Sequence, residues 1–498
     1  MRLGIDFGTT RTIVAAVRDG RHPLAAFDDG DEFRSHVPGI AALVGNELLV
    51  GWPAAHALAS GAAEHAIRSV KRAALALAPD DPVPGLPGVT ALALVARFLT
   101  ELRIALVERS NLEVAADEEL EVMVAVPASA SSRQRWMTLE AFRRAGFTPI
   151  GLVNEPTAAA IEFAHHHLEL GKRSPKRYVV VYDLGGGTFD TSAVSLEGRR
   201  FELLASEGLA HLGGDDFDAL ILDAAGVPHT AAALERAREA KEALRPTTRK
   251  LHLELGAGEP ITLDVARLYA LAQPLIDQTI AQTEQLFERL RDRGIDPGNT
   301  AELGGLYLVG GGAAFPAVVR TLRARFGKKL QLAPQSFAAT AIGLAIAADP
   351  EAHVMIREAV TRHFGVWREA EAGSDKVFDP LLGKDTAAPT VVRRRYRPTH
   401  PVGHLRFLEC GALDGAGQPV QDLVPWADVY FPYDPALAER GDVRSLRELA
   451  IAGNARRPEL MTNEIAETYT YGPDGTISVV IENLSRGYAR SFALGALR

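Results

Sequence analysis

The feature that most constrains this fold is a short hairpin pattern that occurs twice along the chain. In each copy an apolar strand ends in Asp, a turn of Gly and Thr follows, and a second apolar strand runs back. The two copies lie at 3–17 and 179–194. Glycine permits positive φ in such a turn and lets backbone N–H groups approach a ligand. Two copies therefore predict a duplicated α/β domain, with one phosphate-facing hairpin on each side of a cleft.

Strands and helices are expected to alternate around and after the two hairpins. The predicted elements are a buried strand at 120–127, helices at 131–145, 157–166, 231–244 and 266–293, a strand at 306–309 and a helix from about residue 316. Such alternation is typical of a parallel or mixed sheet with helices packed on its faces.

The pattern changes near residue 349. Beyond residue 364 proline turns and short alternating strands dominate. We therefore predict a linker at 349–363 and a separate, mostly β module at 364–498, a normal size for a domain. Because the sequence given ends soon after its last predicted strand, a module without a helical lid is expected.

Composition excludes several classes of protein. The 54 Lys and Arg residues against 63 Asp and Glu residues give a net charge of −9, which argues against nucleic acid as the main partner. One cysteine, Cys410, forms no internal disulfide and excludes a multi-cysteine zinc site. No apolar run is long enough to span a bilayer, and no secretory signal is recognisable. A cytoplasmic protein without a membrane partner is expected.

Backbone amides in the two turns are suited to hold the two ends of a polyphosphate. Asp6 and Asp183 are expected to end adjacent strands at the floor of the cleft. Paired carboxylates there would hold a hydrated Mg²⁺, which prefers one or two carboxylates, water and phosphate oxygens. Either aspartate alone could be an ordinary turn residue. The repeated context lowers the probability of that alternative to roughly one in ten.

Phosphoryl transfer depends mainly on positioning and on charge stabilisation. The chain should therefore supply a cation and a residue that orients the attacking water. Lys71 is the candidate cation, and Glu155 and Asp190 are candidates for orienting water or for weak base catalysis. By spacing alone Lys71 is an ordinary solvated lysine, and its selection depends on a family resemblance.

Four segments carry that resemblance, in order along the chain: IDFGTT at 5–10, NEPTAAA at 154–160, DLGGGTFD at 183–190 and LGGDDFD at 212–218. With these segments the chain resembles the seventy-kilodalton heat-shock (DnaK-like) chaperone family, within the actin/hexokinase-like ATPase superfamily. The resemblance implies a duplicated actin-like (ribonuclease H-like) ATPase domain at 1–348, with lobe I at about 1–172 and lobe II at about 173–348. Over the C-terminal module, which would be β-sandwich-like, the resemblance is weak.

The same resemblance assigns site residues. It implies catalytic roles for Lys71, Glu155, Asp183, Thr188 and Asp190, and a Mg²⁺ held through water by Asp6 and Asp183. It implies contacts with ATP or ADP for Asp6, Gly8, Thr9, Thr10, Gly185, Gly186, Gly187, Thr188, Gly213, Gly214, Asp215, Lys241, Gly310, Gly311 and Gly312. Lys241 is expected near the ribose and adenine, and the glycines at 310–312 under the base.

The adenine side departs from the family pattern. Arg11 follows Thr10 where the family usually has another residue, and Arg238, Glu242 and Arg245 replace residues common in the helix that clamps the base. The stretch 313–315 lacks the arginine that usually stacks on adenine, a loss of about 0.5–2 kcal/mol. Phosphate binding and hydrolysis are therefore expected, together with weaker binding of the base.

The resemblance implies a chaperone-like ATPase that hydrolyses ATP slowly and thereby binds and releases a polypeptide client, with a J-domain-type co-chaperone as a further partner. An alternative is a nucleotide-controlled scaffold or regulatory protein with one dedicated partner and little turnover. A small-molecule kinase is a third interpretation, and the sequence contains no signal for its catalytic base.

Three other features are interpreted as structural. The histidines at 165–167 are expected at an exposed helix end rather than in a metal site. The basic run at 393–397 is expected to form a strand edge that discourages aggregation. Cys410 is expected to be a small buried residue.

Overall fold

The structure is a computed structural model. It describes residues 1–498 except positions 31, 169–173, 256–258, 359, 361, 371–374, 385, 427, 439–442, 454, 473, 474 and 494–498. Contacts divide the chain into two units, the first formed by Met1–Ala128 with Thr138–Ile356 and the second by Ser129–Met137 with Arg357–Arg498. Within the described part of the chain, no helix combines the length and the apolar character that a membrane crossing needs.

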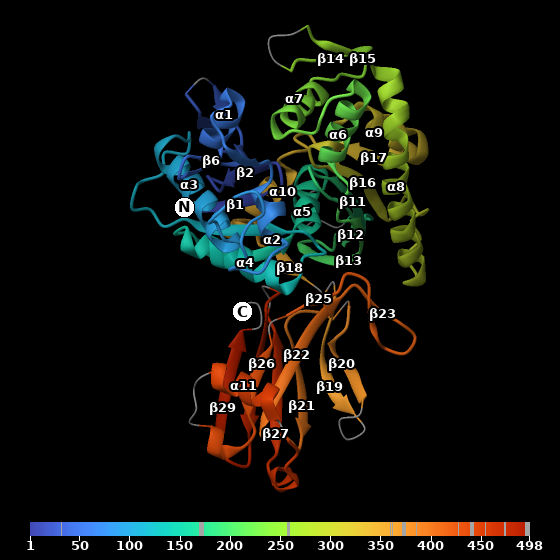
Figure 1. The fold of residues 1–498 in the computed structure, drawn as a ribbon. Helices are drawn as coiled ribbons and strands as arrows, with labels where there is room; N and C mark the ends of the chain where they lie inside the picture. The colour runs from blue at the N-terminus through green and yellow to red at the C-terminus, as the bar shows by residue number, and fades with distance from the viewer. Residues whose placement is uncertain are drawn as a thin grey trace. The chain divides into compact units, whose positions relative to one another are not determined.

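The first hairpin lies inside a five-stranded mixed sheet of the first unit (Figure 1). The strand order is β10-β9-β1-β2-β5. β1 pairs antiparallel with β2 and parallel with β9, so the first hairpin has a neighbour on both sides. The bounds are β1 Arg2–Phe7, β2 Arg11–Ala16, β5 Val37–Pro38, β9 Glu121–Val126 and β10 Thr148–Asn154.

The second hairpin lies inside a six-stranded sheet with the order β17-β16-β11-β12-β13-β18. β11 pairs antiparallel with β12 and parallel with β16, which repeats the arrangement of β1 with β2 and β9. β18 comes from the segment expected to be a linker, and its Met355 N–H donates to Arg199 O at 2.8 Å. The bounds are β11 Tyr178–Leu184, β12 Phe189–Ser195, β13 Arg200–Leu209, β16 Leu303–Val309, β17 Leu330–Leu332 and β18 Met355–Arg357.

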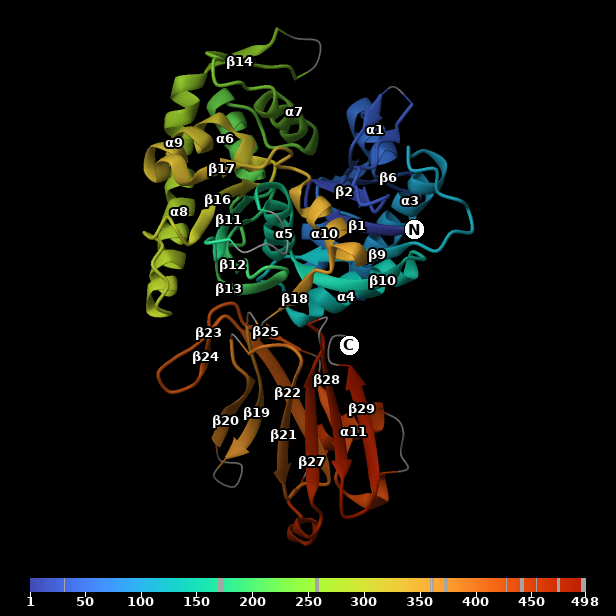
Figure 2. The same ribbon diagram turned by 180° about the vertical axis from the view of Figure 1, so that it is seen from behind.

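Two helices lie between these sheets: α5 (Glu155–His167) and α10 (Ala339–Ala348) (Figures 1 and 2). Both are apolar around most of their circumference, which is the composition of a helix buried on all sides. The helices pack against each other so closely that a Cβ on Gly343 would lie 1.8 Å from Ala158 O. Glu155 begins α5, so this packing holds a predicted site residue in place.

Further helices and small sheets complete the first unit, which includes α4 from Thr138 onward. The helices are α1 Trp52–Ser60, α2 Val70–Leu75, α3 Ala91–Glu108, α4 Ser132–Arg144, α6 Gly214–Ala225, α7 Ala231–Glu242, α8 Val265–Asp292 and α9 Pro316–Phe326. The remaining strands are β3 Phe27–Asp28, β4 Phe33–Arg34, β6 Ala41–Val44, β7 Glu47–Val50, β8 His65–Ile67, β14 Lys250–Leu253 and β15 Ile261–Asp264.

In the second unit two antiparallel sheets bury side chains in one shared core. One sheet has the order β20-β19-β22-β25, with β26 also paired to β22, and the other has the order β21-β27-β28-β29. Trp426 and Phe431 are buried in this unit, so they serve packing. The elements are β19 His363–Ala370, β20 Asp375–Leu382, β21 Thr390–Tyr396, β22 Val402–Cys410, β23 Ala412–Leu413, β24 Pro419–Val420, β25 Val424–Pro425, β26 Val429–Pro432, α11 Val443–Gly453, β27 Ile465–Tyr471, β28 Ile477–Asn483 and β29 Tyr488–Ala493.

Candidate functional site

The turns of the two hairpins touch each other. A Cβ built on Gly186 would lie 1.9 Å from the Thr10 hydroxyl oxygen, so glycine is needed at this contact. The second turn is closed by its own hydrogen bond, in which Gly185 N–H donates to Thr188 O at 3.0 Å. The structure therefore brings together the two glycine turns, 8–10 and 185–188, on which the sequence places the phosphates.

Asp6 and Asp183 do not end adjacent strands, and that expectation is wrong. They lie on β1 and β11, which belong to different sheets because each hairpin pairs with strands of its own repeat. Asp183 instead lies directly opposite Asp190 in the antiparallel register of β11 and β12. Asp6 and Asp183 still lie close enough that the charge of Asp6 raises the pKa of Asp183.

Lys71 lies in the first turn of α2 and is buried, with 8% of its surface exposed. The helix begins there because the Ser69 hydroxyl accepts a hydrogen bond from Arg72 N–H, as an N-cap does. Lys71 Nζ donates to Glu155 Oε1 at 2.7 Å. Burial alone would lower the pKa of Lys71, but the negative charges of Glu155 and Asp6 outweigh burial and raise it. The ammonium is therefore fixed and charged.

Four carboxylates interact electrostatically with this one ammonium, and we call them the carboxylate cluster: Asp6, Glu155, Asp183 and Asp190. Burial, and then the charge of Glu155, raise the pKa of Asp6 to about 7. The same two causes raise the pKa of Asp190 to about 7. Lys71 opposes these shifts without cancelling them, so burial and the neighbouring carboxylates together outweigh the charge of one lysine.

This donor set fits a hydrated divalent cation bound together with phosphates. Among the described residues no group of three or more His, Cys, Asp or Glu side chains could hold a metal ion by itself. A cation that keeps most of its ligands as water and phosphate oxygens needs only one or two carboxylates, as Mg²⁺ does. Asp6 and Asp183, one from each hairpin, are the residues that would supply them.

The N-terminus of α6 lies directly on the second turn. Gly214 N–H donates to Gly185 O at 2.9 Å, and Asp215 N–H donates to Gly186 O at 2.7 Å. A Cβ on Gly213 would lie 2.6 Å from Gly187 N, so this N-terminus approaches the turn as closely as glycine allows. The structure thus places Gly213, Gly214 and Asp215 beside the second glycine turn, at the N-terminus of α6.

Lys241 on α7 reaches the same N-terminus. Its Nζ donates to Gly214 O at 2.6 Å and lies 2.6 Å from Asp218 Oδ1, whose side chain is fully buried. Asp218 also pairs with Arg68 at 3.2 Å. Lys241 therefore belongs to an ion-pair network next to the second glycine turn.

The three glycines after β16 differ in how closely other atoms approach them. A Cβ on Gly310, where φ is +85°, would lie 2.5 Å from Asp183 Oδ1. Gly312 packs against Leu184 O in the same way, at 2.9 Å. A Cβ on Gly311 would meet no atom within 4 Å. Gly310 and Gly312 are thus required by the close approach of β11, and Gly311 faces open space.

Sequence reasoning missed the arginines that link the two sides of the site. Arg72 donates to Gly187 O and lies 3.4 Å from Asp215 Oδ2, and Arg11 pairs with Glu242 on α7. These pairs join residues more than 100 positions apart, so no local sequence motif could predict them. The available signals were the position of Arg72 next to Lys71 and the unusual residue at Arg11.

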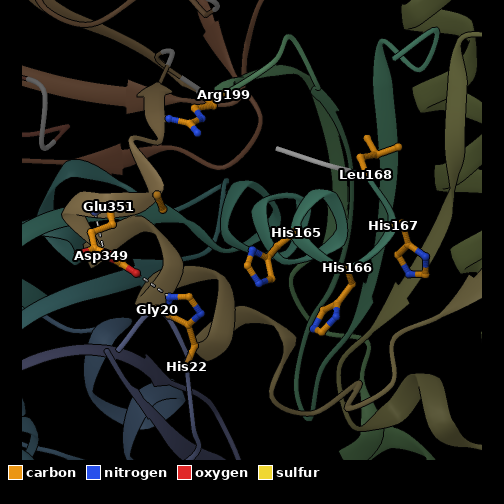
Figure 3. A pocket seen from close by; sticks show the side chains of 10 residues that line it. Gly20, His22, His165, His166, His167, Leu168, Arg199, Asp349 and Glu351 are labelled. Carbon is orange, nitrogen blue, oxygen red and sulfur yellow. Dashed lines mark hydrogen bonds and ion pairs between the residues drawn. The ribbon is translucent and has the colours of Figure 1, made fainter. Parts of the chain in front are cut away.

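The three histidines at the end of α5 are exposed, as predicted for a helix end. Figure 3 shows them along a pocket of the first unit with His22 and Asp349, whose side chains approach to 3.2 Å. Burial lowers the pKa of His22 although the contact with Asp349 raises it. The pocket is separate from the residues of the carboxylate cluster; it is lined by Gly20, His22, His165, His166, His167, Leu168, Arg199, Asp349, Glu351 and Ala352.

Comparison with known proteins places this geometry in context. A family model described as Hsp70 protein matches residues 93–354. The chaperone protein HscA homolog of Burkholderia pseudomallei (strain 668) is 33% identical over 381 residues, which cover 70% of this chain and 58% of that protein. The homolog of Burkholderia thailandensis is 32% identical with the same coverage, and that of Burkholderia mallei (strain SAVP1) is 33% identical. The chain therefore spans less than two thirds of the length of these relatives.

Proposed function

Because the chain belongs to the Hsp70 family, we propose that it is an ATP-dependent chaperone. Its first unit binds Mg·ATP between the two hairpin turns and hydrolyses it slowly. Its second unit holds a polypeptide, and the nucleotide changes that hold. The family membership supports an actin-like ATPase fold, and we propose that the two large sheets are its two lobes and that the second unit is a β-sandwich.

One observation carries the ATPase proposal: a single buried lysine lies among four carboxylates beside two touching glycine turns. An ordinary structural lysine needs one partner, and four carboxylates gathered without matching cations raise the energy of the folded chain. Such an arrangement is typical of a functional site, where perturbed pKa values collect. A divalent cation would offset part of this excess negative charge, and it would also attract the phosphates of a nucleotide.

Each residue then has a role in hydrolysis. The amides of the turns hold phosphate oxygens, and Asp6 and Asp183 hold the hydration shell of the cation. Mg²⁺, when bound, supplies positive charge that offsets the charge developing on the phosphates. Lys71 keeps a fixed positive charge at the same place, positioned by Glu155. Asp190, with its raised pKa, is suited to orient water and to accept its proton.

Three further parts of the proposal extend from the family resemblance. A J-domain-type co-chaperone is the expected partner of the first unit. The cytoplasm is the expected location of a chain with one cysteine, Cys410, which is buried. Adenine is expected to bind with reduced affinity, since Arg11 and Glu242 pair with each other on the side where the base is expected.

A charged network in the second unit supports the alternative of a scaffold with one dedicated partner. Arg368 pairs with Glu467 and with Asp379, both at 2.7 Å, and Arg394 pairs with Asp379 at 2.8 Å. Tyr396 also donates to Glu467, which is fully buried, at 2.6 Å. These side chains fill part of the space between the sheets with paired charges, which leaves less apolar surface for a generic client.

The two candidates differ in one measurable rate. A fluorescent, extended apolar peptide is bound to the full chain, and its dissociation is followed after addition of Mg·ATP or Mg·ADP. For a chaperone we expect Mg·ATP to accelerate release at least about tenfold over Mg·ADP, within the usual range of coupling between sites. Equal release rates in a protein that still hydrolyses ATP would favour the scaffold.

A further inference from the structure

Strand β21 is a long, regular edge of the second unit. It runs from Thr390 to Tyr396 and pairs with β27 on one side. Within the described residues it forms no ladder on its other side, and its backbone makes no other backbone hydrogen bond. The register against β27 continues over seven residues without a bulge. One edge of β21 therefore offers a row of N–H and C=O groups for strand pairing.

One other edge of the second unit, β20, carries devices that block such pairing. The edge strand β20 contains Pro380, which cannot donate to a ladder, and its register is irregular near Phe364. β21 itself has proline only outside its bounds, at Pro389 and Pro398. Only the positive charge of its side chains protects β21 against pairing with another strand. That charge repels basic strands and attracts acidic ones.

The side chains of β21 alternate strictly between two faces. Val391, Arg393 and Arg395 are exposed, and Arg397 directly after the strand is exposed as well. Of the three arginines, Arg395 has an ion pair, with Glu464 at 3.5 Å, and 69% of its side chain stays exposed. Among the described residues no carboxylate pairs with Arg393 or Arg397. The outward face thus presents three positive charges at every second residue.

Side chains on the opposite face of the strand make contacts inside the second unit. Arg394 pairs with Asp379, and Tyr396 donates to Glu467. The exposed arginines are therefore not needed to complete the internal network. They are available to a partner that lies along the edge.

We propose that β21 binds an extended acidic segment of another polypeptide as an added strand, with carboxylates at alternate positions beside Arg393, Arg395 and Arg397. Backbone hydrogen bonds supply affinity and the alternating charges supply register, as in other cases of strand addition. The whole chain carries a net charge of −9, so this local row of positive charge stands out against the overall charge and favours an acidic segment. The basic stripe still keeps copies of this chain apart, because β21 repels itself.

This inference deepens the proposed function, since it names the chemistry of the polypeptide that the second unit holds. The two remain separable in experiment. Nucleotide binding is a property of the first unit and is measured without peptide, whereas strand addition is measured without nucleotide.

The test uses the full chain and a fluorescent peptide of sequence Thr-Glu-Val-Glu-Val-Glu-Thr, followed by anisotropy. We expect the double substitution Arg393→Glu/Arg395→Glu to weaken binding at least about tenfold. Lys376→Glu on the exposed part of β20 serves as the matched control and should change affinity less than about twofold. The arginines are exposed, so thermal unfolding of the double variant should match the parent protein.

Backbone pairing is tested with peptides N-methylated at alternate residues. N-methylation removes the N–H donors of one strand edge and leaves the charges unchanged, so methylation of one alternate set should abolish binding and of the other should preserve it. Equal affinity for both methylated peptides, equal losses in the two protein variants, or no binding by the parent protein would each overturn the inference.

Discussion

Replacing Lys71 with Met is expected to lower the rate of ATP hydrolysis at least about 10²-fold, the usual cost of removing one fixed charge that stabilises a transition state. The ammonium of Lys71 opposes the raised pKa values of Asp6, Asp183 and Asp190, and Glu155 holds it at 2.7 Å. Affinity for ADP should fall much less, because the backbone amides of the turns remain. Single-turnover hydrolysis and an ADP titration separate the two effects.

The variant must be distinguished from a merely unstable protein. Removing one partner of a buried ion pair costs about 3–5 kcal/mol of folding free energy. The double substitution Lys71→Met/Glu155→Gln removes both partners of the ion pair and leaves the net charge of the cluster as in the parent protein, so it should be more stable than Lys71→Met while remaining inactive. Lys328→Met, at an exposed lysine, should keep full activity. Normal hydrolysis by the folded double variant would exclude this site.

Replacing Gly343 with Ala is expected to destabilise the first unit by roughly 3 kcal/mol, the upper part of the usual range for overpacking. The added Cβ would lie 1.8 Å from Ala158 O, a backbone atom of a buried helix that cannot turn aside. α5 and α10 would have to separate, and Glu155 moves with α5. Thermal unfolding of the full chain should show the transition of the first unit lowered by about 4 °C.

Gly311→Ala is the matched control for this measurement, because a Cβ there meets no atom within 4 Å and its φ of −66° suits alanine. Its unfolding transition should stay within about 1 °C of the parent protein. If Gly343→Ala unfolds at the same temperature as Gly311→Ala, the close packing of α5 on α10 is not a feature of the folded chain.

The duplicated hairpins could be predicted from the sequence because their signal is local. Alternation of apolar strands with glycine turns identifies β1 with β2 and β11 with β12, and the helix at 155–167 follows from its proline-led start. Which strands pair with each other could not be predicted as well from the sequence. Asp6 and Asp183 were expected on neighbouring strands, yet sheet neighbours are set by long-range packing, and each hairpin forms its own sheet.

The ion pairs of the site could not be predicted. Arg68 and Asp218 are 150 positions apart, and a single arginine or aspartate carries no signal of its partner. Lys71 itself was selected through family resemblance, and only the fold shows that it is buried among carboxylates. β18 was also missed, since three residues inside an expected linker do not form a recognisable strand until β13 offers an edge.

The central claim is that one aspartate from each hairpin holds a hydrated divalent ion together with the phosphates. A titration of the full chain with ADP, in Mg²⁺ and in excess chelator, tests it most directly in the parent protein, in Asp6→Asn and in Asp183→Asn. The account predicts that Mg²⁺ strengthens ADP binding by at least about 1.4 kcal/mol, or tenfold, in the parent protein and that each substitution removes most of this gain. An affinity for ADP that is the same with and without Mg²⁺ would contradict the claim. So would a gain in affinity from Mg²⁺ that stays unchanged in both variants.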